Sequence, residues 1–251
     1  MPFFSIIVAT LRRPSYANLV QSIRNQTFTD WELIARCDPD VNEYISRNLA
    51  AKQATGEYLF FTDDDCVLPS DYLAVARDDI DRGSWPSGLS GPVMLPDRAG
   101  NMKKIEQPTW GIGANMIIRA EYFRKLGGFE ETWGLPYPVK GWRSDTQIWW
   151  KLEDAYPGKL KYSPRLVVNH PEQMKSEWIP AVEDVFFRRH RAKYIQRFVP
   201  VDPRGCQFLI ETQDLTADER AYVLKCRKAI RKQDSGIPLL DAEKEEDDGG
   251  G

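Results

Sequence analysis

The sequence has few cysteines, no long apolar run and no excess of positive charge. Its four cysteines, Cys37, Cys66, Cys206 and Cys226, lie far apart and form no CxxC pair, so neither a structural zinc site nor a disulfide framework is expected. The longest apolar run, residues 3–11, is too short to cross a bilayer and lacks the features of a signal peptide. These absences favour a cytoplasmic protein without a transmembrane segment.

The charge balance limits the class of partner. The 251 residues include 34 basic and 37 acidic side chains, which gives a net charge of −3. A protein that neutralises many phosphates along a nucleic acid needs a strongly basic surface, so nucleic acid is not an expected partner. A single nucleotide remains compatible with this composition.

The first hundred residues alternate short apolar runs with amphipathic stretches, which is typical of a parallel sheet covered by helices. The order of apolar runs predicts an α/β fold with a Rossmann-like, mostly parallel sheet and a helical extension at the C-terminal end. Predicted strands are 3–10, 31–37, 57–62, 89–95, 114–119 and 166–168. Predicted helices are 15–25, 42–54, 69–81, 121–126, 145–155 and 182–198.

Some of these helices have predicted buried faces. Leu19, Val20 and Ile23 form one such face, and Ile45 and Leu49 form another. Glycines end the helices that precede them, Gly56 after 42–54 and Gly127 after 121–126. The helix at 182–198 is basic and amphipathic, which suits packing onto the domain better than binding to an anionic membrane.

Three carboxylates, Asp63, Asp64 and Asp65, directly follow the third predicted strand. Ligands bind at this carboxyl edge in open parallel sheets. Alternate side chains of an extended segment share a face, so Asp63 and Asp65 converge while Asp64 turns away. Oxygen ligands favour a hard cation such as Mg²⁺ or Mn²⁺. The alternative is a solvated loop whose acids cap the next helix.

Four segments resemble, in order, the motifs of the family 2 glycosyltransferases, which have the GT-A fold. Residues 4–38 are similar to the opening strand, the helix ending in NQT and the second strand. Residues 45–65 are similar to the RN helix, the GEY turn and the DxD strand. Residues 113–129 resemble the strand with the GGF turn, and 143–152 stand where the family has its ED helix. The resemblance spans residues 3–171.

The resemblance implies a transfer of sugar from a nucleoside-diphosphate donor to a hydroxyl of a glycan or glycoconjugate acceptor. It divides the chain into a nucleotide-sugar half (1–95) and an acceptor half (96–175) of one domain. A helical extension (176–235) and a disordered tail or linker (236–251) follow. The terminal glycines suit either one module of a longer chain or an added linker.

The resemblance also assigns the donor side of the site. Asp65, with Asp63, would hold Mn²⁺ or Mg²⁺, and Asp63 and Asp64 would face the donor. His170 matches a histidine that several GT-A enzymes use as a metal or phosphate ligand, although a structural role is as reasonable. The other residues at donor-binding positions are Thr10, Arg12, Asp38 and Arg47.

The second strand departs from the family pattern of two acidic residues, because Cys37 replaces the first. Only Asp38 is left to accept a hydrogen bond from a uracil imide. A UDP-sugar is therefore the expected donor, with thymidine and guanosine donors left open.

Asp145 matches the general base of an inverting transfer, and Ser144 replaces the glutamate that usually precedes it. A carboxylate there would take the proton of the acceptor hydroxyl as its oxygen attacks the anomeric carbon. A helix N-terminus lowers the pKa of such a carboxyl and burial raises it, so its direction stays open. Trp110, Asn115 and Trp142, from the central loops, are the expected acceptor-binding residues.

Two alternative functions remain. A sugar-nucleotide nucleotidyltransferase also places carboxylates and Mg²⁺ beside a nucleotide, but it usually has a glycine-rich loop after its first strand. Residues 11–15 contain arginines and no glycine. A non-catalytic sugar-binding domain of the same fold would be expected to have lost the DxD acids or Asp145, and both are present.

Overall fold

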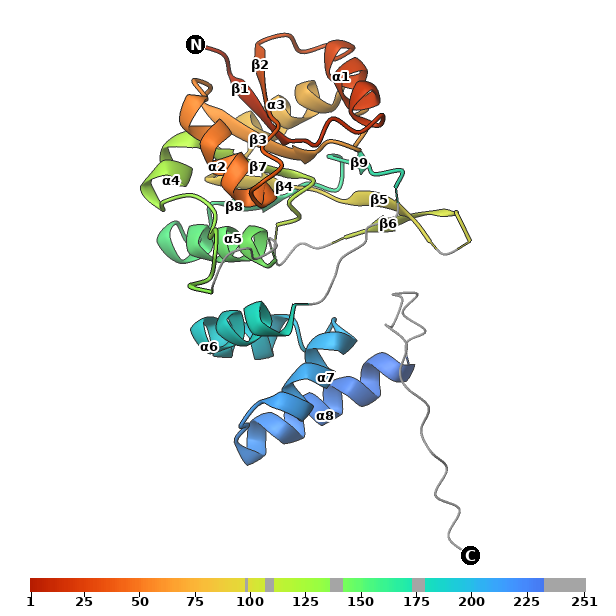
Figure 1. Cartoon of the computed structure of the whole chain (residues 1–251), viewed down its shortest axis with the longest axis vertical. Helices are drawn as coiled ribbons and strands as arrows, with labels where there is room; N and C mark the ends of the chain where they lie inside the picture. Colours follow the sequence, from red (N-terminus) through yellow and green to blue (C-terminus); the bar gives the residue numbers. More distant parts are fainter. Residues whose placement is uncertain (98, 107–110, 136–141, 173–178, 233–251) are drawn as a thin grey trace, which may run out of the picture. The chain divides into compact units, whose positions relative to one another are not determined.

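The computed structural model describes residues 1–97, 99–106, 111–135, 142–172 and 179–232 (Figure 1). The chain forms two compact units, residues 1–183 and a second unit that begins at Asp184. The strands are β1 Phe4–Ala9, β2 Trp31–Arg36, β3 Tyr58–Asp63, β4 Gly88–Ser90, β5 Val93–Pro96, β6 Met102–Ile105, β7 Met116–Arg119, β8 Leu160–Tyr162 and β9 Val168–Asn169. The helices are α1 Tyr16–Arg24, α2 Glu43–Gln53, α3 Tyr72–Arg82, α4 Ala120–Lys125, α5 Ser144–Ala155, α6 Pro180–Arg197, α7 Pro203–Thr212 and α8 Ala217–Lys232.

The first unit is built on a sheet with the strand order β2-β1-β3-β7-β4-β8. Strand β1 is parallel to both β2 and β3, and Phe4 pairs with Trp31 on one side and with Tyr58 on the other. Only β7 runs antiparallel to its neighbours β3 and β4. The structure therefore confirms the predicted mostly parallel α/β sheet, and it places Asp63 at the last position of β3.

Helices cover both faces of this sheet (Figure 1). Alternate strand residues such as Ile6 and Phe60 join α1 and α3 in one buried apolar cluster. On the other face, Phe61 contacts the rings of Phe123 in α4 and of Phe129. Because side chains alternate along a strand, each strand contributes to both cores.

The strand predicted at 89–95 is wrong as a single element. It divides at Gly91 and Pro92 into β4, in the large sheet, and β5, in a separate sheet with the order β6-β5-β9. A side chain at Gly91 would overlap the carbonyl oxygen of Leu166, and Pro92 has no N–H to donate to a ladder. Strands β6 and β8 were not predicted, because their sequences are short and partly charged.

The predicted helix faces need correction. Leu19 and Ile23 are buried as expected, but Val20 is only partly buried. Ile45 and Leu49 are also only partly buried, because α2 turns a mainly polar face inward. The buried residues of α2 are Tyr44, Ser46, Arg47, Asn48, Ala50 and Ala51.

The two predicted glycine turns differ in kind. Gly127 ends α4 with a positive φ of 82°, as the helix-ending prediction requires. Gly56 instead lies against β1, where an added Cβ would stand 2.6 Å from Ser5 Oγ. Its smallness, and not its backbone conformation, explains the GEY turn.

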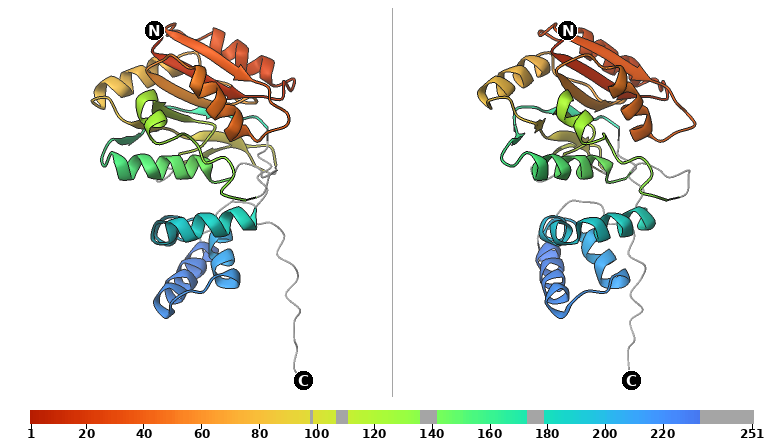
Figure 2. Two further views of the ribbon diagram at one scale, coloured as in Figure 1. Left: turned by 60° about the vertical axis from the view of Figure 1, so that its left-hand side comes forward. Right: turned by 90° about the vertical axis from the view of Figure 1, so that its left-hand side faces the viewer.

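The second unit is helical. Buried aromatic side chains line α6 and the residue that follows it, namely Phe186, Phe187, Tyr194 and Phe198. Helices α7 and α8 pack against each other (Figure 2). Within the described part of the chain, we find no helix with the length and apolar composition that crossing a bilayer requires. The predicted tail, 236–251, lies outside the described residues.

Candidate active site

The three adjacent carboxylates at the end of β3 divide between two sets of partners. Asp64 accepts hydrogen bonds from Thr10 Oγ1 at 2.8 Å, the Leu11 N–H at 3.3 Å and Arg13 Nη2 at 2.5 Å. This carboxylate therefore fastens the loop after β1 to the end of β3. Asp63 and Asp65 share other partners, but the predicted strand alternation is not the cause, because β3 ends at Asp63 and the chain turns at Asp64 and Asp65.

Strand β9 brings a histidine to the other two carboxylates. Val67 and Asn169 exchange backbone hydrogen bonds of 2.7 and 3.1 Å, and the His170 N–H donates to the Met94 carbonyl at 2.9 Å. The chain just after the acidic residues is thus joined to the residue before His170. A pairing between segments a hundred residues apart sets the position of this imidazole.

His170, Asp63 and Asp65 converge. The Nε2 atom of His170 lies 3.2 Å from Asp65 Oδ1 and 3.6 Å from Asp63 Oδ2. Its Nδ1 lies 2.7 Å from the carbonyl oxygen of Glu172. A carbonyl only accepts, so the Nδ1 atom carries the proton, and Nε2 faces the carboxylates. This is the arrangement of a metal-ligating histidine whose orientation is fixed by a backbone acceptor.

These residues fit a divalent cation. Asp63, Asp65, His170 and Cys66 can each offer one ligand atom, and those atoms lie within 4.8 Å of one another. Asp65 Oδ1 is buried and accepts no hydrogen bond, so an acceptor is left over for a cation. Burial raises the pKa of the Cys66 thiol, which disfavours the thiolate that a metal requires. The two carboxylates and the imidazole form the candidate ligand set.

The electrostatics of this group are dominated by burial and by opposite charges. Burial works to raise the pKa of Asp63, but Arg47 and His170 lower it to about 2. Burial works to lower the pKa of His170, but Asp63 and Asp65 raise it to about 9. The pKa of Asp65 is raised, first by burial and also by the neighbouring charge of Asp63. The carboxylates are thus partly neutralised by protein cations.

The predicted donor residue Arg47 is buried and not an exposed helix residue. Its side chain is 3% exposed and its Nη2 donates to Asp63 Oδ1. The next residue, Asn48, exchanges hydrogen bonds of 2.9 Å with the backbone of Phe129 in the GGF turn. Adjacent residues of α2 therefore hold the end of the DxD strand and the GGF turn.

The predicted general base Asp145 is the second residue of α5 and is partly buried. Its Oδ2 accepts the Gly113 N–H at 3.0 Å, and its Oδ1 accepts the Thr146 N–H at 2.7 Å. Burial raises the pKa of Asp145, and these two hydrogen bonds oppose the shift without reversing it. The sequence left the direction of the Asp145 pKa shift open, and in the structure this pKa is raised.

Gly113 links Asp145 to the metal side of the site. A Cβ added at this position would lie 2.9 Å from Arg47 Nη1, 3.4 Å from Asp145 Oδ2 and 3.5 Å from the Tyr44 hydroxyl. A larger residue here would have to displace the end of the Arg47 side chain, whereas its distances to Asp145 and Tyr44 would be ordinary contacts. Arg47 and Asp145 consequently face the same short segment of chain.

Three other predicted donor residues lie near β1 and β2. Thr10 is buried, and its hydroxyl donates to Asp64 and accepts the Arg12 N–H at 2.7 Å. Arg12 has a positive φ of 56° and an exposed side chain. Asp38 accepts hydrogen bonds of 2.9 and 2.7 Å from Arg36 and another from Ser46. The structure brings Thr10 to the acidic cluster, and the side chain of Arg12 is exposed.

Two of the predicted acceptor residues, Asn115 and Trp142, lie in the described part of the chain. Asn115 is fully buried, and its Nδ2 donates to the carbonyls of Pro92 and Leu166 at 2.9 and 2.7 Å. Its Oδ1 accepts from Tyr72, so this amide makes its hydrogen bonds inside the core. Trp142 is partly exposed and lies two residues before the first residue of α5. Trp110 lies outside the described residues.

Sequence reasoning missed several residues of the site. Arg13, next to the predicted Arg12, contacts Asp64, Asp65 and Glu172. The run LRRP showed two candidate arginines, but only the backbone turn at Arg12 decides which one reaches the carboxylates. Gly113 begins the segment 113–129 that resembles the strand with the GGF turn, and that resemblance gives it no role of its own.

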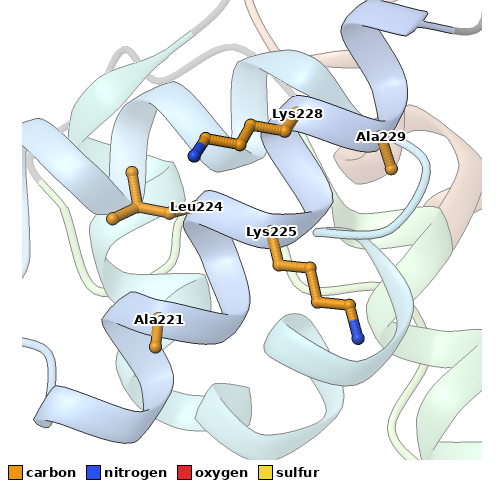
Figure 3. A pocket seen from close by; sticks show the side chains of 5 residues that line it. All are labelled: Ala221, Leu224, Lys225, Lys228 and Ala229. Atoms are coloured by element: carbon orange, nitrogen blue, oxygen red, sulfur yellow. The ribbon is translucent and has the colours of Figure 1, made fainter.

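A surface hollow on α8 belongs to the second unit and offers different chemistry. Its lining consists of Ala221, Leu224, Lys225, Lys228 and Ala229 (Figure 3). Two ammonium groups and no carboxylate line it, so it contributes nothing to the candidate metal site.

Comparison with known proteins supports the fold. No family profile and no curated protein matches the sequence. Residues 1–349 of TarS from S. aureus, in complex with UDP-GlcNAc, align with a TM-score of 0.56 at 14% identity, covering 90% of this chain and 79% of that chain. The same TarS fragment aligns with TM-scores of 0.52 in one structure and 0.51 in complex with UDP, each at 14% identity and covering 93% of this chain and 92% of that one. The chain has the GT-A fold that its four sequence motifs predicted.

Proposed function

We propose that the protein is a metal-dependent glycosyltransferase that moves a sugar from a UDP-sugar to an acceptor hydroxyl with inversion. The observation that carries this proposal is the convergence of Asp63, Asp65 and His170 at the carboxyl end of β3, with Asp145 beside the adjoining Gly113 segment. The likeness to TarS in complex with UDP-GlcNAc supports the choice of donor.

On the donor side, Asp65, Asp63 and His170 hold Mn²⁺ or Mg²⁺. When bound, this cation supplies positive charge against the departing diphosphate. Arg13 adds a guanidinium that is 49% exposed at its side chain, so part of it remains free to meet a phosphate oxygen. Asp38 keeps acceptor capacity beyond its bonds to Arg36 and Ser46, because a carboxylate has about four lone-pair sites. That capacity suits a uracil imide.

Thr10, Asp64 and Arg47 act on the donor site through its carboxylates. Thr10 and Asp64 fix the loop that carries Arg12 and Arg13. Arg47 orients Asp63 by a charged hydrogen bond in a buried setting, where such bonds are strong.

On the acceptor side, Asp145 takes the proton of the acceptor hydroxyl. The acceptor oxygen then forms its bond to the anomeric carbon while the bond from that carbon to the diphosphate breaks on the opposite face. The raised pKa of Asp145 makes it a better proton acceptor than an ordinary exposed aspartate. The bonds to Gly113 and Thr146 orient the carboxylate.

The acceptor is expected to be a glycan or glycoconjugate. Trp142 is partly exposed near Asp145 in the sequence, and an aromatic face of this kind can stack on a sugar ring.

The proposed location is the cytoplasm, whose reducing conditions suit the free thiols of Cys37, Cys66, Cys206 and Cys226.

Calorimetric titration of UDP-GlcNAc, with and without Mn²⁺, tests the donor assignment, and GDP- and dTDP-sugars serve as competitors. We expect binding that requires the metal and prefers uridine. UDP release should accompany turnover, and NMR of the first product should show an inverted anomeric centre. If UDP-GlcNAc released no UDP, but UTP and GlcNAc 1-phosphate together released pyrophosphate, the protein would be a nucleotidyltransferase. Metal-dependent binding without turnover would identify a sugar-binding domain.

A further inference from the structure

The two residues ahead of the helix that carries Asp145 are held by one buried carboxylate. Glu183 is fully buried, and it accepts hydrogen bonds from Arg143 Nε and Nη2, both at 3.0 Å. The same carboxylate accepts the Trp142 Nε1–H at 2.6 Å. Glu183 stands in the first turn of α6, 40 residues after Arg143.

The backbone at Arg143 explains why an anchor is needed there. Arg143 has φ 62° and ψ 0°, a left-handed conformation, and α5 begins at the next residue. Residues with a Cβ avoid this conformation unless surrounding contacts enforce it. The paired hydrogen bonds to Glu183 supply such contacts, because a guanidinium fork on a carboxylate fixes both distance and orientation.

The segment from Trp142 to Asp145 is fastened at successive residues. The Trp142 carbonyl accepts the Trp133 Nε1–H at 2.9 Å, and Ser144 Oγ donates to the Glu130 carbonyl at 2.7 Å. Ser144, which replaces the family's glutamate, thus ties α5 to the chain after the GGF turn. Glu183 is the charged member of this set of anchors.

We propose that Glu183 is a positioning residue for Asp145, acting through Arg143 and Trp142. This inference rests on the proposed function, in which Asp145 accepts the proton of the attacking hydroxyl. Glu183 fixes the turn that aims Asp145, so its loss displaces the base without removing it. A displaced base slows proton transfer steeply, because the reaction depends on a separation close to hydrogen-bond length.

The donor side should respond differently. Asp63 and Asp64 take their hydrogen bonds from Arg47 in α2 and Arg13 in the loop after β1. These elements precede α5 in the chain and hold their carboxylates by contacts of their own. Loss of Glu183 should therefore lower kcat and leave the affinity for metal and donor unchanged.

The test measures UDP release from UDP-GlcNAc with Mn²⁺ and with water as the acceptor. Glu183→Gln keeps the shape of the side chain and removes the charge that pairs with Arg143. We expect kcat to fall by about 10-fold to 100-fold, with KM for UDP-GlcNAc and Kd for UDP changed less than threefold. Glu183→Asp, which restores the charge on a shorter side chain, should recover part of kcat.

A matched control removes a carboxylate of the second unit that also accepts two hydrogen bonds from one arginine. Glu219 accepts from Arg191 Nε at 2.8 Å and from Nη2 at 2.6 Å. Glu219→Gln should leave kcat unchanged. A Glu183→Gln variant with full kcat, or with kcat and donor affinity lost together, overturns the proposal. So does an equal loss in the control.

Arg143→Lys provides a second route if Glu183→Gln does not fold. It keeps a positive charge near Glu183 but cannot form the two-pronged contact, so kcat should fall with donor affinity kept, and unchanged kcat would refute the positioning role. Failure of the proposed function looks different, because wild-type protein would then show neither metal-dependent UDP-GlcNAc binding nor UDP release.

Discussion

Replacing Asp145 by asparagine separates proton transfer from binding, and the structure sets the size of each effect. Each carboxylate oxygen accepts a backbone N–H, one from Gly113 and one from Thr146. An asparagine has a single acceptor oxygen, so its NH₂ group must face one of these donors. A lost hydrogen bond with a donor left unpaired costs about 1–3 kcal/mol, which lowers Tm by about 2–4 °C per kcal/mol in a chain of this size.

The effect on turnover is larger. The amide cannot accept the hydroxyl proton, so kcat for transfer should fall by about 10²-fold to 10⁴-fold. This loss corresponds to about 2.7–5.4 kcal/mol in the activation free energy. Affinity for UDP-GlcNAc and Mn²⁺ should stay near that of the wild type, because Asp63, Asp65 and His170 are untouched.

The pH profile gives an independent signature. Burial raises the pKa of Asp145, so wild-type kcat should increase with pH as this carboxyl loses its proton, and the Asp145→Asn profile should be flat over the same range. Stability changes in the opposite sense. The unfolded chain loses the Asp145 proton near pH 4, whereas the folded chain keeps it to a higher pH. The contribution of Asp145 to stability therefore falls as the pH rises from about 4 through the pKa of the folded chain.

The assay is UDP release at saturating donor, with calorimetry and thermal melts on the same samples. Asp154→Asn makes the same chemical change at an exposed position of the same helix and should leave kcat unaltered. If Asp145→Asn abolished metal-dependent UDP binding, the residue would belong to the metal site. Full transfer activity in this variant, or retention of the anomeric configuration in the product, would refute the assigned mechanism.

Three further predictions concern the metal site and the tail. Asp63→Ala and Asp65→Ala should both abolish Mn²⁺-dependent UDP binding. Only Asp63→Ala should also destabilise the fold, by about 3–5 kcal/mol, because it leaves the buried charge of Arg47 without its partner. Equal midpoints of urea unfolding for the two variants would contradict this. Burial works to lower the pKa of His170, but Asp63 and Asp65 raise it to about 9. Because ligation needs the neutral ring, Mn²⁺ affinity should rise by up to about tenfold per pH unit between about pH 6 and 9. A Mn²⁺ affinity that does not change with pH would remove His170 from the ligand set. Removing residues 234–251, which are rich in acidic residues and glycine, should leave the melting temperature and UDP affinity unchanged, and aggregation of the shortened protein would show that the boundary is misplaced.

The features that sequence could predict are those set by local pattern. Strands β1 to β3 are apolar runs bounded by turns, and their order with the intervening helices specifies a parallel sheet. Because parallel strands share their carboxyl edge, the position of Asp63 and Asp65 followed from β3 alone. The convergence of these two carboxylates, predicted from the two-residue period of a strand, has another cause, because β3 ends at Asp63 and the chain turns at Asp64 and Asp65.

The features that sequence could not predict depend on long-range contacts. The two arginines after β1 look equivalent, and only the positive φ of Arg12 brings Arg13 to the carboxylates. The apolar run at 89–95 looks like one strand, but the close approach of Leu166 at Gly91 divides it between two sheets. Asn115 is a residue type that is common in loops, whereas in the structure its amide is hydrogen-bonded to three segments of the core.

The two functional carboxylates differ in a way that matches their proposed roles. Arg47 donates to Asp63, which remains ionised because its pKa is lowered to about 2 despite burial. At Asp145 the same guanidinium is a weaker influence than burial, and the pKa is raised. A metal ligand binds in its charged form and a base must bind a proton during turnover, so the opposite shifts of Asp63 and Asp145 suit their proposed tasks. Asp65, also in the candidate ligand set, has a raised pKa, so this contrast applies to Asp63 alone. Asp63 accepts a charged hydrogen bond from Arg47, whereas Asp145 accepts backbone N–H groups of Gly113 and Thr146, and this difference in partners accompanies the opposite pKa shifts of the two carboxylates.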